Sequence, residues 1–260
     1  MAAPHLVRTE AVVLRRHDLG EADRIVTLYT ASGGKLRAVA KGVRRPTSRL
    51  GGHLELFTRC QVMLARGRNL DIITQVETVD PHLGIRENLW RASLAYYAAE
   101  IIDRLTEDRS DSPGLYDLLT QALERIANSR RPNHALHLFL VQLLSGLGYR
   151  SELQRCVQCR RPLEAVENGF SAIAGGALCP NCRALDAASR PLSLSLNALK
   201  VLRLCQVGDW PSIERLRLEV ALNDELEEVL RNLVQHIAES KLKSAAFVAT
   251  LRDEGLAGKP

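Results

Sequence analysis

Aromatic side chains are scarce in this sequence, and the patterns typical of membrane and secreted proteins are missing from it. Phe, Trp and Tyr make up 4% of the 260 residues, which excludes stacking on bases as the main binding device throughout the chain. No segment approaches the run of about 18 apolar residues that a membrane helix needs. Residues 1–16 contain neither the apolar stretch nor the small-residue cleavage site of a secretory signal. We therefore expect a cytoplasmic protein without a membrane partner.

Motifs of the common enzyme classes are also missing. The sequence has no G-x-x-x-x-G-K-[ST] phosphate loop, no G-x-S-x-G nucleophile elbow and no H-E-x-x-H zinc helix. His134 and His137 stand three residues apart without a carboxylate spaced to complete a metal site, so we interpret them as ordinary surface or core histidines. We interpret the acidic pair Glu21 and Asp23 as part of a turn or as a partner of Arg24. These absences predict a protein that is not an enzyme.

Positive charge is concentrated in the first third of the chain. The net charge is +5; residues 1–80 hold 13 Lys and Arg against 8 Asp and Glu, whereas residues 81–260 hold 22 of each. Between Lys35 and Arg68, nine basic residues face only Glu55. A field concentrated in this way attracts polyanions. The segment therefore predicts a nucleic-acid-binding surface, with a solvated basic face that has no ligand as the alternative.

The first 80 residues have the pattern of β-strands. Five runs of strand length are rich in β-branched or alternating apolar residues, and turn residues such as Ser32-Gly33-Gly34 separate them. Five strands without helices between most of them favour a small closed barrel, either the OB-fold that commonly binds nucleic acids or an SH3-like barrel. The long basic segment 42–56 is expected to be a functional or disordered loop. The predicted strands are Val7–Arg16, Arg24–Thr30, Lys35–Ala40, Phe57–Ala65 and Leu70–Glu77.

After Pro81 the spacing of apolar residues becomes helical. Stripes at intervals of three and four residues predict a helical bundle, and Pro113 and Pro132 mark the starts of two of its helices. The predicted fold class is α+β: an N-terminal five-stranded OB-fold barrel followed by an all-α helical domain with an inserted module that contains four of the cysteines. The predicted boundaries are 1–80 for the DNA-binding barrel, 81–250 for the bundle, 153–185 for the inserted module and 251–260 for a flexible tail.

Four of the six cysteines form the strongest chemical signal in the chain. Cys156-Val-Gln-Cys159 and Cys179-Pro-Asn-Cys182 are two C-x2-C knuckles separated by 19 residues, and a spacer of that length returns the second knuckle to the first. Four thiolates suit a closed tetrahedral Zn²⁺ site with a structural role. Two disulfides or an iron–sulfur cluster are the alternatives. The two remaining cysteines are isolated and are expected in the core: Cys60 and Cys205.

The front of the chain resembles the RecO family. The resemblance is carried by the run Gly20–Thr30, which is followed by Gly34–Pro46, Ser48-Arg49-Leu50 and Ile72–Glu77. Within it, Ala40-Lys41-Gly42 followed by basic residues is specific in this context. The whole resemblance covers approximately residues 6–240.

The cysteine module also resembles that of many RecO members. Phe170-Ser171 and Gly175-Gly176 stand between the two knuckles, and the step Gly148-Tyr149 leads into the module. One departure is visible: Arg160-Arg161 follow the first knuckle, where members with the metal site often have glycine. This departure puts the shape of the hairpin in doubt but leaves the four ligands in place.

The resemblance implies a recombination mediator that works without nucleotide hydrolysis. Similar proteins bind single- and double-stranded DNA, anneal complementary strands and, with RecR, help load RecA on DNA coated with single-strand-binding protein. The implied partners are DNA, RecR and the C-terminal tail of single-strand-binding protein, with RecF and RecA as further candidates. A zinc-ribbon OB-fold factor that binds RNA in translation or transcription is the alternative.

The DNA-binding side chains are expected on the third strand, in the loop after it and on the following hairpin. They would pair with phosphates without reading sequence. The predicted metal ligands are Cys156, Cys159, Cys179 and Cys182, and the predicted DNA-binding residues are Lys35, Arg37, Lys41, Arg44, Arg45, Arg49, Arg66 and Arg68.

Overall fold

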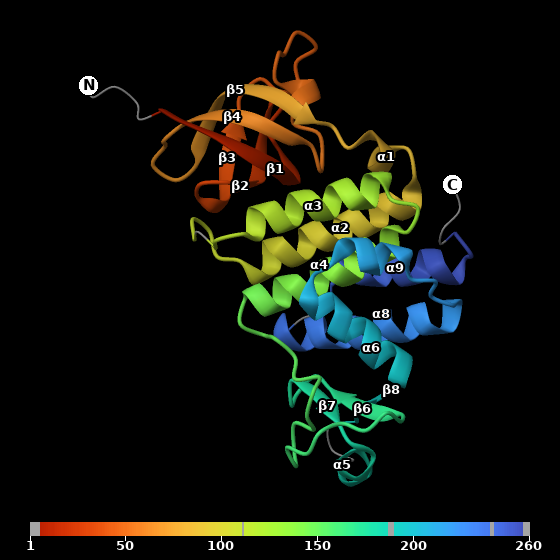
Figure 1. Ribbon diagram of the computed structural model, residues 1–260. Helices are drawn as coiled ribbons and strands as arrows, with labels where there is room; N and C mark the ends of the chain where they lie inside the picture. Colours follow the sequence, from red (N-terminus) through yellow and green to blue (C-terminus); the bar gives the residue numbers. More distant parts are fainter. Residues whose placement is uncertain (1–5, 111, 187–189, 240–241, 257–260) are drawn as a thin grey trace. The chain divides into compact units, whose positions relative to one another are not determined.

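The computed structural model describes residues 6–110, 112–186, 190–239 and 242–256 of the chain. The chain divides into two compact units, the first ending at Asn128 and the second beginning at Ser129. Figure 1 shows the strands and helices of both units, coloured from red at the N-terminus to blue at the C-terminus. No helix in the described part of the chain has the length and apolar character needed to cross a membrane.

The first unit begins with a closed five-stranded barrel. Around the ring the strands follow the order β1-β2-β3-β5-β4, and β4 pairs with β1 to close it. Every pair is antiparallel except β3 with β5, which are parallel. This order is that of an OB-type barrel, so the predicted OB-fold is confirmed over the SH3-like alternative. The strands are β1 (Leu6–Leu19), β2 (Asp23–Thr30), β3 (Gly34–Ala40), β4 (Arg59–Ala65) and β5 (Asp71–Asp80).

Alternation along the strands separates an inner face of the barrel from an outer one. One row on the outer face is also buried: Val12, Tyr29 and Lys35 are cross-strand neighbours in β1, β2 and β3. An outer row is buried when another element covers it, and the helices of the same unit provide that cover. The inner core contains Ala11, Val13, Val26, Leu28, Leu36, Ala38, Ala40, Cys60, Val62, Leu64, Ile73 and Val76, closed by Val43 and Leu54.

Three helices complete the first unit: α1 (Leu83–Arg86), α2 (Leu89–Leu105) and α3 (Leu115–Asn128). The ring of Phe57, just before β4, meets Tyr96 of α2 edge-on with 4.9 Å between centroids. Tyr116 of α3 donates a hydrogen bond to the Glu10 carboxylate of β1 at 3.0 Å. The compact unit therefore combines the barrel with these helices, while the domain boundary after residue 80 stays a prediction.

The connection between α2 and α3 fills a gap in the barrel wall. The parallel pairing of β3 with β5 joins Ala38 to Asp71 and Val39 to Ile72. Closer to the start of β3, before the residues that pair with β5, the Arg109 N–H donates a hydrogen bond to the Lys35 carbonyl at 2.6 Å. The Arg109 guanidinium also pairs with the Asp71 carboxylate at 3.0 Å. A residue from the helical part of the unit thus ties the start of β3 to the start of β5.

The second unit is a helical bundle that carries the cysteine module. Its three longest helices in the described part of the chain are α4 (Pro132–Gly146), which begins at Pro132 as predicted, α6 (Leu196–Val207) and α8 (Val220–Ile237). Ser195 caps α6, since its hydroxyl accepts a hydrogen bond from Ala198 N–H at 3.1 Å. Helices α4, α6 and α8 contribute the largest share of the buried apolar side chains of the bundle. The described part of this bundle also contains the shorter helices α7 (Trp210–Arg215) and α9 (Lys243–Asp253).

The expected flexible tail, residues 251–260, begins too early. Helix α9 continues to Asp253, so the first three residues of that range are helical. Ala245, Val248 and Leu251 recur every three residues on α9 and are buried, and this apolar face holds the helix on the bundle. Residues 257–260 lie outside the described residues.

The histidine pair of α4 belongs to the core, as expected. His134 and His137 are both buried, and Nδ1 of His137 has no hydrogen-bond partner in the described part of the chain. Burial, together with the nearby His134 and Arg252, lowers the pKa of His137 to about 3. The folded unit therefore holds this imidazole neutral at pH values where an unfolded chain would protonate it.

Acid is expected to destabilise the second unit through His137. The folded pKa lies below the ordinary value of 6.5, so this histidine costs no stability above pH 6.5. Below pH 6.5, His137 is protonated in the unfolded chain but stays neutral in the folded unit. The free energy of unfolding therefore falls by about 1.4 kcal/mol per pH unit. Urea unfolding at pH 7.5 and 5.5 measures the drop in the free energy of unfolding between these pH values. The His137→Leu variant is expected to show a smaller drop. His236→Gln, at an exposed position on α8, is the control; equal acid sensitivity in both variants would contradict this assignment.

Candidate metal centre and nucleic-acid interface

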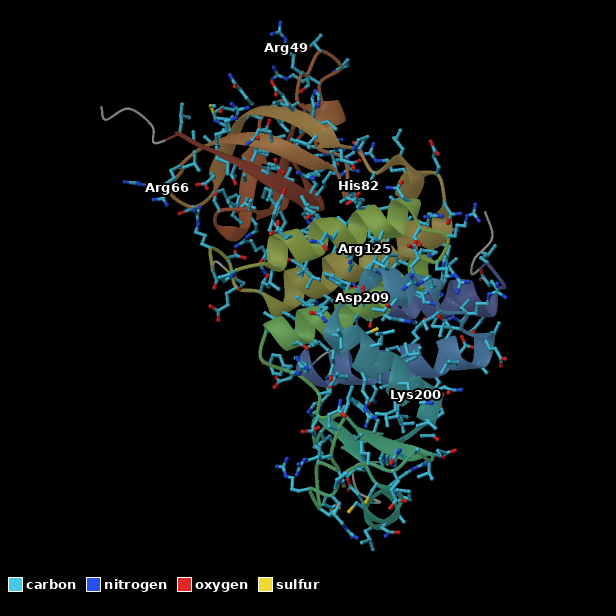
Figure 2. All side chains as sticks on the ribbon, in the orientation of Figure 1. Arg49, Arg66, His82, Arg125, Lys200 and Asp209 are labelled. Carbon is cyan, nitrogen blue, oxygen red and sulfur yellow. The ribbon has the colours of Figure 1, made fainter. Side chains whose placement is uncertain are left out.

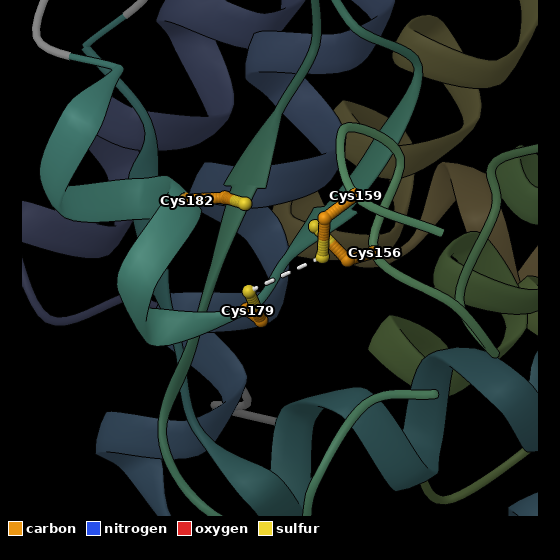
Figure 3. Close-up of side chains that lie close together, drawn as sticks. All are labelled: Cys156, Cys159, Cys179 and Cys182. Atoms are coloured by element: carbon orange, nitrogen blue, oxygen red, sulfur yellow. Dashed lines mark hydrogen bonds between the residues drawn. The ribbon is translucent and has the colours of Figure 1, made fainter. Parts of the chain in front are cut away.

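The four knuckle cysteines converge on one point of the second unit. Their sulfur atoms all lie within 4.8 Å of one another. Figure 3 shows the four side chains, Cys156, Cys159, Cys179 and Cys182, close together. The sulfurs of Cys159 and Cys179 are 3.8 Å apart. A tetrahedral ion with Zn–S bonds of about 2.3 Å places its ligands about 3.8 Å from each other. The group is therefore a possible metal site, and its sulfur spacing fits a single ion.

The cysteines of this site do not form disulfide bonds. All six cysteines are free, and a sulfur–sulfur distance of 3.8 Å is far beyond the roughly 2.05 Å of a disulfide bond. The backbone N–H of Arg161 lowers the pKa of Cys159 to about 6, which favours the thiolate that a metal requires. Burial raises the pKa of Cys182 to about 12, so binding at this thiol would have to displace its proton.

Short local elements position the four thiols. The first knuckle closes with Cys156 N–H donating to the Arg161 carbonyl at 2.9 Å. The second knuckle opens the short helix α5 (Pro180–Leu185), with Cys179 as its N-cap residue. Strands β6 (Asn168–Ser171) and β7 (Gly176–Leu178) form the hairpin between the knuckles, and β8 (Leu192–Leu194) pairs with β6. The predicted hairpin that returns one knuckle to the other is confirmed.

Close backbone packing attaches this hairpin to the first knuckle. A Cβ added at Gly176 would stand 2.3 Å from the Glu152 carbonyl oxygen, so a larger residue there would push the two segments apart. The Gly176–Glu152 approach is an isolated β-bridge, and Ala177 N–H donates to the Glu152 carbonyl at 2.8 Å. The glycine at this step is therefore a requirement of the module.

Arg160 explains how the module tolerates a departure from the family pattern. Its φ angle is 63°, in the left-handed region that glycine adopts without penalty and other residues adopt at a cost of about 1 kcal/mol. Its N–H donates to the Cys156 carbonyl at 2.9 Å. The chain keeps the turn that glycine favours, and the four ligands stay together.

The two isolated cysteines lie in cores, as expected. Cys60 and Cys205 are both fully buried. Burial raises the pKa of each thiol to about 12, so neither is a reactive thiolate.

The predicted DNA-binding residues fall into two exposed groups and one neutralised pair. The loop after β3 carries what we name the loop cluster, Lys41, Arg44, Arg45 and Arg49. The turn between β4 and β5 carries the hairpin cluster, Arg66 and Arg68. Figure 2 shows Arg49 and Arg66 at well-separated places on the barrel. The two clusters therefore do not border each other.

Lys35 and Arg37 lie on β3 between these clusters, and both side chains form ion pairs with carboxylates. The Lys35 ammonium is buried, donates to the Asp103 carbonyl at 2.5 Å, and lies 3.5 Å from the carboxylates of both Asp103 and Asp108. Arg37 is exposed but pairs with Asp108 at 3.3 Å. Lys35 thus holds the barrel to the helices of its unit, and it is poorly placed to meet a phosphate.

One acidic residue distant in sequence also pairs with a member of the loop cluster. Arg44 lies 3.6 Å from the Asp18 carboxylate and donates to the Gly20 carbonyl at 3.1 Å. By contrast, no hydrogen bond or ion pair with the described residues is found for the side chains of Lys41, Arg45, Arg49, Arg66 and Arg68, which are all exposed.

Each end of the barrel has an arginine-lined hollow that sequence reasoning did not assign. One, of about 440 Å³, is lined by Arg16, His17, Asp18, Arg24 and Leu56. The other, of about 290 Å³, includes Arg66 and Arg109 beside the hydroxyl-bearing Thr9, Thr30 and Ser32. The flanking turns were visible in the sequence, but Arg109 belongs to a segment that only the fold brings to the barrel.

Comparison with known proteins covers nearly the whole chain. Residues 1–82 match the family described as Recombination protein O N terminal, and residues 86–246 match Recombination protein O C terminal. The DNA repair protein RecO of Roseiflexus sp. (strain RS-1) is 41% identical over 94% of this chain and 86% of its own length. RecO of Nocardioides sp. (strain ATCC BAA-499 / JS614) is 39% identical over 94% of this chain and 99% of its own length.

A third relative matches a slightly larger share of this chain. The DNA repair protein RecO of Dehalococcoides mccartyi (strain CBDB1) is 36% identical over 97% of this chain and 98% of its own length. These matches decide against an RNA-binding factor of translation or transcription. The chain therefore belongs to the RecO family of DNA repair proteins, which are recombination mediators rather than enzymes.

Proposed function

We propose that this protein binds single- and double-stranded DNA on its barrel and anneals complementary strands. With RecR, it would help RecA load on DNA coated with single-strand-binding protein. The observation that carries the DNA-binding part is the set of five exposed cationic side chains on an OB-type barrel that have no ion-pair partner in the described part of the chain. These are Lys41, Arg45, Arg49, Arg66 and Arg68. Such side chains bind phosphates and release counterions without reading sequence.

Annealing follows physically from the same charges. Two DNA strands repel each other through their phosphates, and a basic protein surface that neutralises both lowers that repulsion. Holding two strands on one protein also raises their local concentration. Neither effect requires nucleotide hydrolysis, in agreement with the missing phosphate loop.

We infer that Zn²⁺ is the ion of the cysteine site and that its role is structural. Cys156, Cys159, Cys179 and Cys182 would hold it, and four thiolates leave no open position for a substrate. When bound, zinc supplies folding free energy to a module whose core is small. The apolar side chains around the ligands are few, namely Val157, Leu163 and Leu178.

The protein partners in this proposal are RecR and the C-terminal tail of single-strand-binding protein, with RecF and RecA as further candidates. Membership in the RecO family supports them. The tail is acidic and apolar at its end, so an apolar groove with a basic rim on the helical unit would suit it.

The salt dependence of DNA binding tests the role of the five cations. For a strand of about 40 nucleotides, long enough to reach both clusters, five phosphate contacts predict a slope of log affinity against log salt near −3.5, at about −0.7 per contact. Replacing Lys41, Arg45 and Arg49 with glutamine is expected to reduce the slope to about −1.4. Fluorescence anisotropy titrations over a series of salt concentrations give these slopes.

The matched control removes three charges from exposed positions of the second unit. A triple variant with Arg130, Lys200 and Arg217 replaced by glutamine is expected to keep the slope of the unmodified protein. If the loop-cluster variant keeps both the affinity and the slope of the unmodified protein, the loop cluster does not bind DNA.

A further inference from the structure

We propose that a single barrel binds two separate DNA segments at once, one at each end. This inference rests on the proposed function, because it divides the DNA-binding surface into two sites. The loop cluster would form one site, beside the hollow lined by Arg16 and Arg24, whose guanidinium groups pair with Glu55 and Asp18. The hairpin cluster would form the other site, beside the hollow lined by Arg66 and Arg109, and of these two Arg109 pairs with Asp71.

Strand register places the two sites at opposite ends of the barrel. The loop cluster follows the last residue of β3, Ala40, which is paired with Arg24. The hollow with Arg66 is lined by Gly33, at the opposite end of β3, and by Val7 at the start of β1. Six residue steps along β3, at about 3.3 Å each, separate these ends by about 20 Å.

The surface between the sites is not a continuous basic track. Lys35 and Arg37 lie on β3 between the ends, and the Asp103 and Asp108 carboxylates neutralise them. A strand that ran straight along β3 from one cluster to the other would pass this acidic pair. The charge pattern therefore favours two sites over one long groove.

The separation also suits the annealing reaction. At physiological ionic strength, electrostatic repulsion is screened over about 8 Å, so two backbones about 20 Å apart repel each other weakly. Each would have its own arginine side chains to contact its phosphates. Two strands held this way share one protein molecule, and bases that face away from the barrel remain available for pairing.

Counting short strands on one chain tests the inference. Thymidine oligonucleotides of about six residues are long enough to fill one site of this kind, and native mass spectrometry counts them per protein chain whatever the oligomeric state. We expect two per chain for the unmodified protein at saturation. A Lys41→Gln, Arg45→Gln, Arg49→Gln variant and an Arg66→Gln, Arg68→Gln variant are each expected to bind one.

Two controls complete the design. The variant with Arg130, Lys200 and Arg217 replaced by glutamine is expected to bind two oligonucleotides, and circular dichroism verifies that each variant is folded. One oligonucleotide per unmodified chain, weakened to a similar extent by either cluster variant, would show a single shared interface and overturn the inference. No binding of either short or long strands by the unmodified protein would instead overturn the proposed function itself.

Discussion

A Cys179→Ala variant of the full chain is expected to lose its zinc and to unfold the cysteine module. Structural zinc contributes about 10–16 kcal/mol in small zinc modules at neutral pH, which is comparable with the stability of about 5–15 kcal/mol of a typical domain. The side chains packed around the four thiols are few, so the module has little core to compensate. Elemental analysis is expected to give one zinc per unmodified chain and none in the variant.

Limited proteolysis separates loss of the metal from general damage. New cleavage is expected between residues 153 and 185 in the Cys179→Ala variant. Cys205→Ala is the matched control, because Cys205 is a buried cysteine of the same unit that is not a ligand. It is expected to keep its zinc. A Cys179→Ala variant with one zinc per chain and unchanged proteolysis would show that the four thiols are not a metal site.

A fragment of residues 1–80 is expected not to fold, whereas a fragment of residues 1–128 is expected to fold. Truncation at residue 80 exposes the outer row of Val12 and Tyr29 and the ring of Phe57, which are buried in the intact unit. Exposing one large apolar side chain costs about 1.5–3 kcal/mol. A domain of this size rarely has more than about 3–5 kcal/mol of stability in total.

The shorter fragment also loses polar contacts of the barrel wall. Arg109 no longer joins Lys35 to Asp71, and the Glu10 carboxylate loses its hydrogen bond from Tyr116. Urea unfolding followed by circular dichroism is expected to show a cooperative transition for residues 1–128 and none for residues 1–80. A cooperative transition in the shorter fragment would support the boundary that the sequence predicted.

Local patterns were enough to predict the five strands of the barrel and the clustering of the four cysteines. Period-two alternation placed five strands within a few residues of their observed ends. The spacing of Cys156, Cys159, Cys179 and Cys182 predicts that their sulfur atoms converge, because two C-x2-C knuckles need only a hairpin between them to meet. The strand order that distinguishes an OB-type barrel from an SH3-like one is a non-local property, and it required the fold.

The division of the basic surface was beyond the reach of the sequence. Lys35 is one basic residue among many until Asp103 and Asp108, far along the chain, are brought to it. The same applies to Arg44, whose partner Asp18 lies near the end of β1. The left-handed conformation of Arg160 was also hidden, because propensity alone assigns that conformation to glycine. Charge counts find a basic segment, but only tertiary contacts show which charges are free.

The most direct test of the account is the annealing of two complementary labelled oligonucleotides coated with the cognate single-strand-binding protein, without nucleotide. The account predicts faster annealing with the unmodified protein, loss of that acceleration in high salt, and its loss in the Lys41, Arg45, Arg49 glutamine variant. The variant with Arg130, Lys200 and Arg217 replaced would retain it. No acceleration by a zinc-loaded, folded protein would contradict the central claim that this barrel brings complementary strands together.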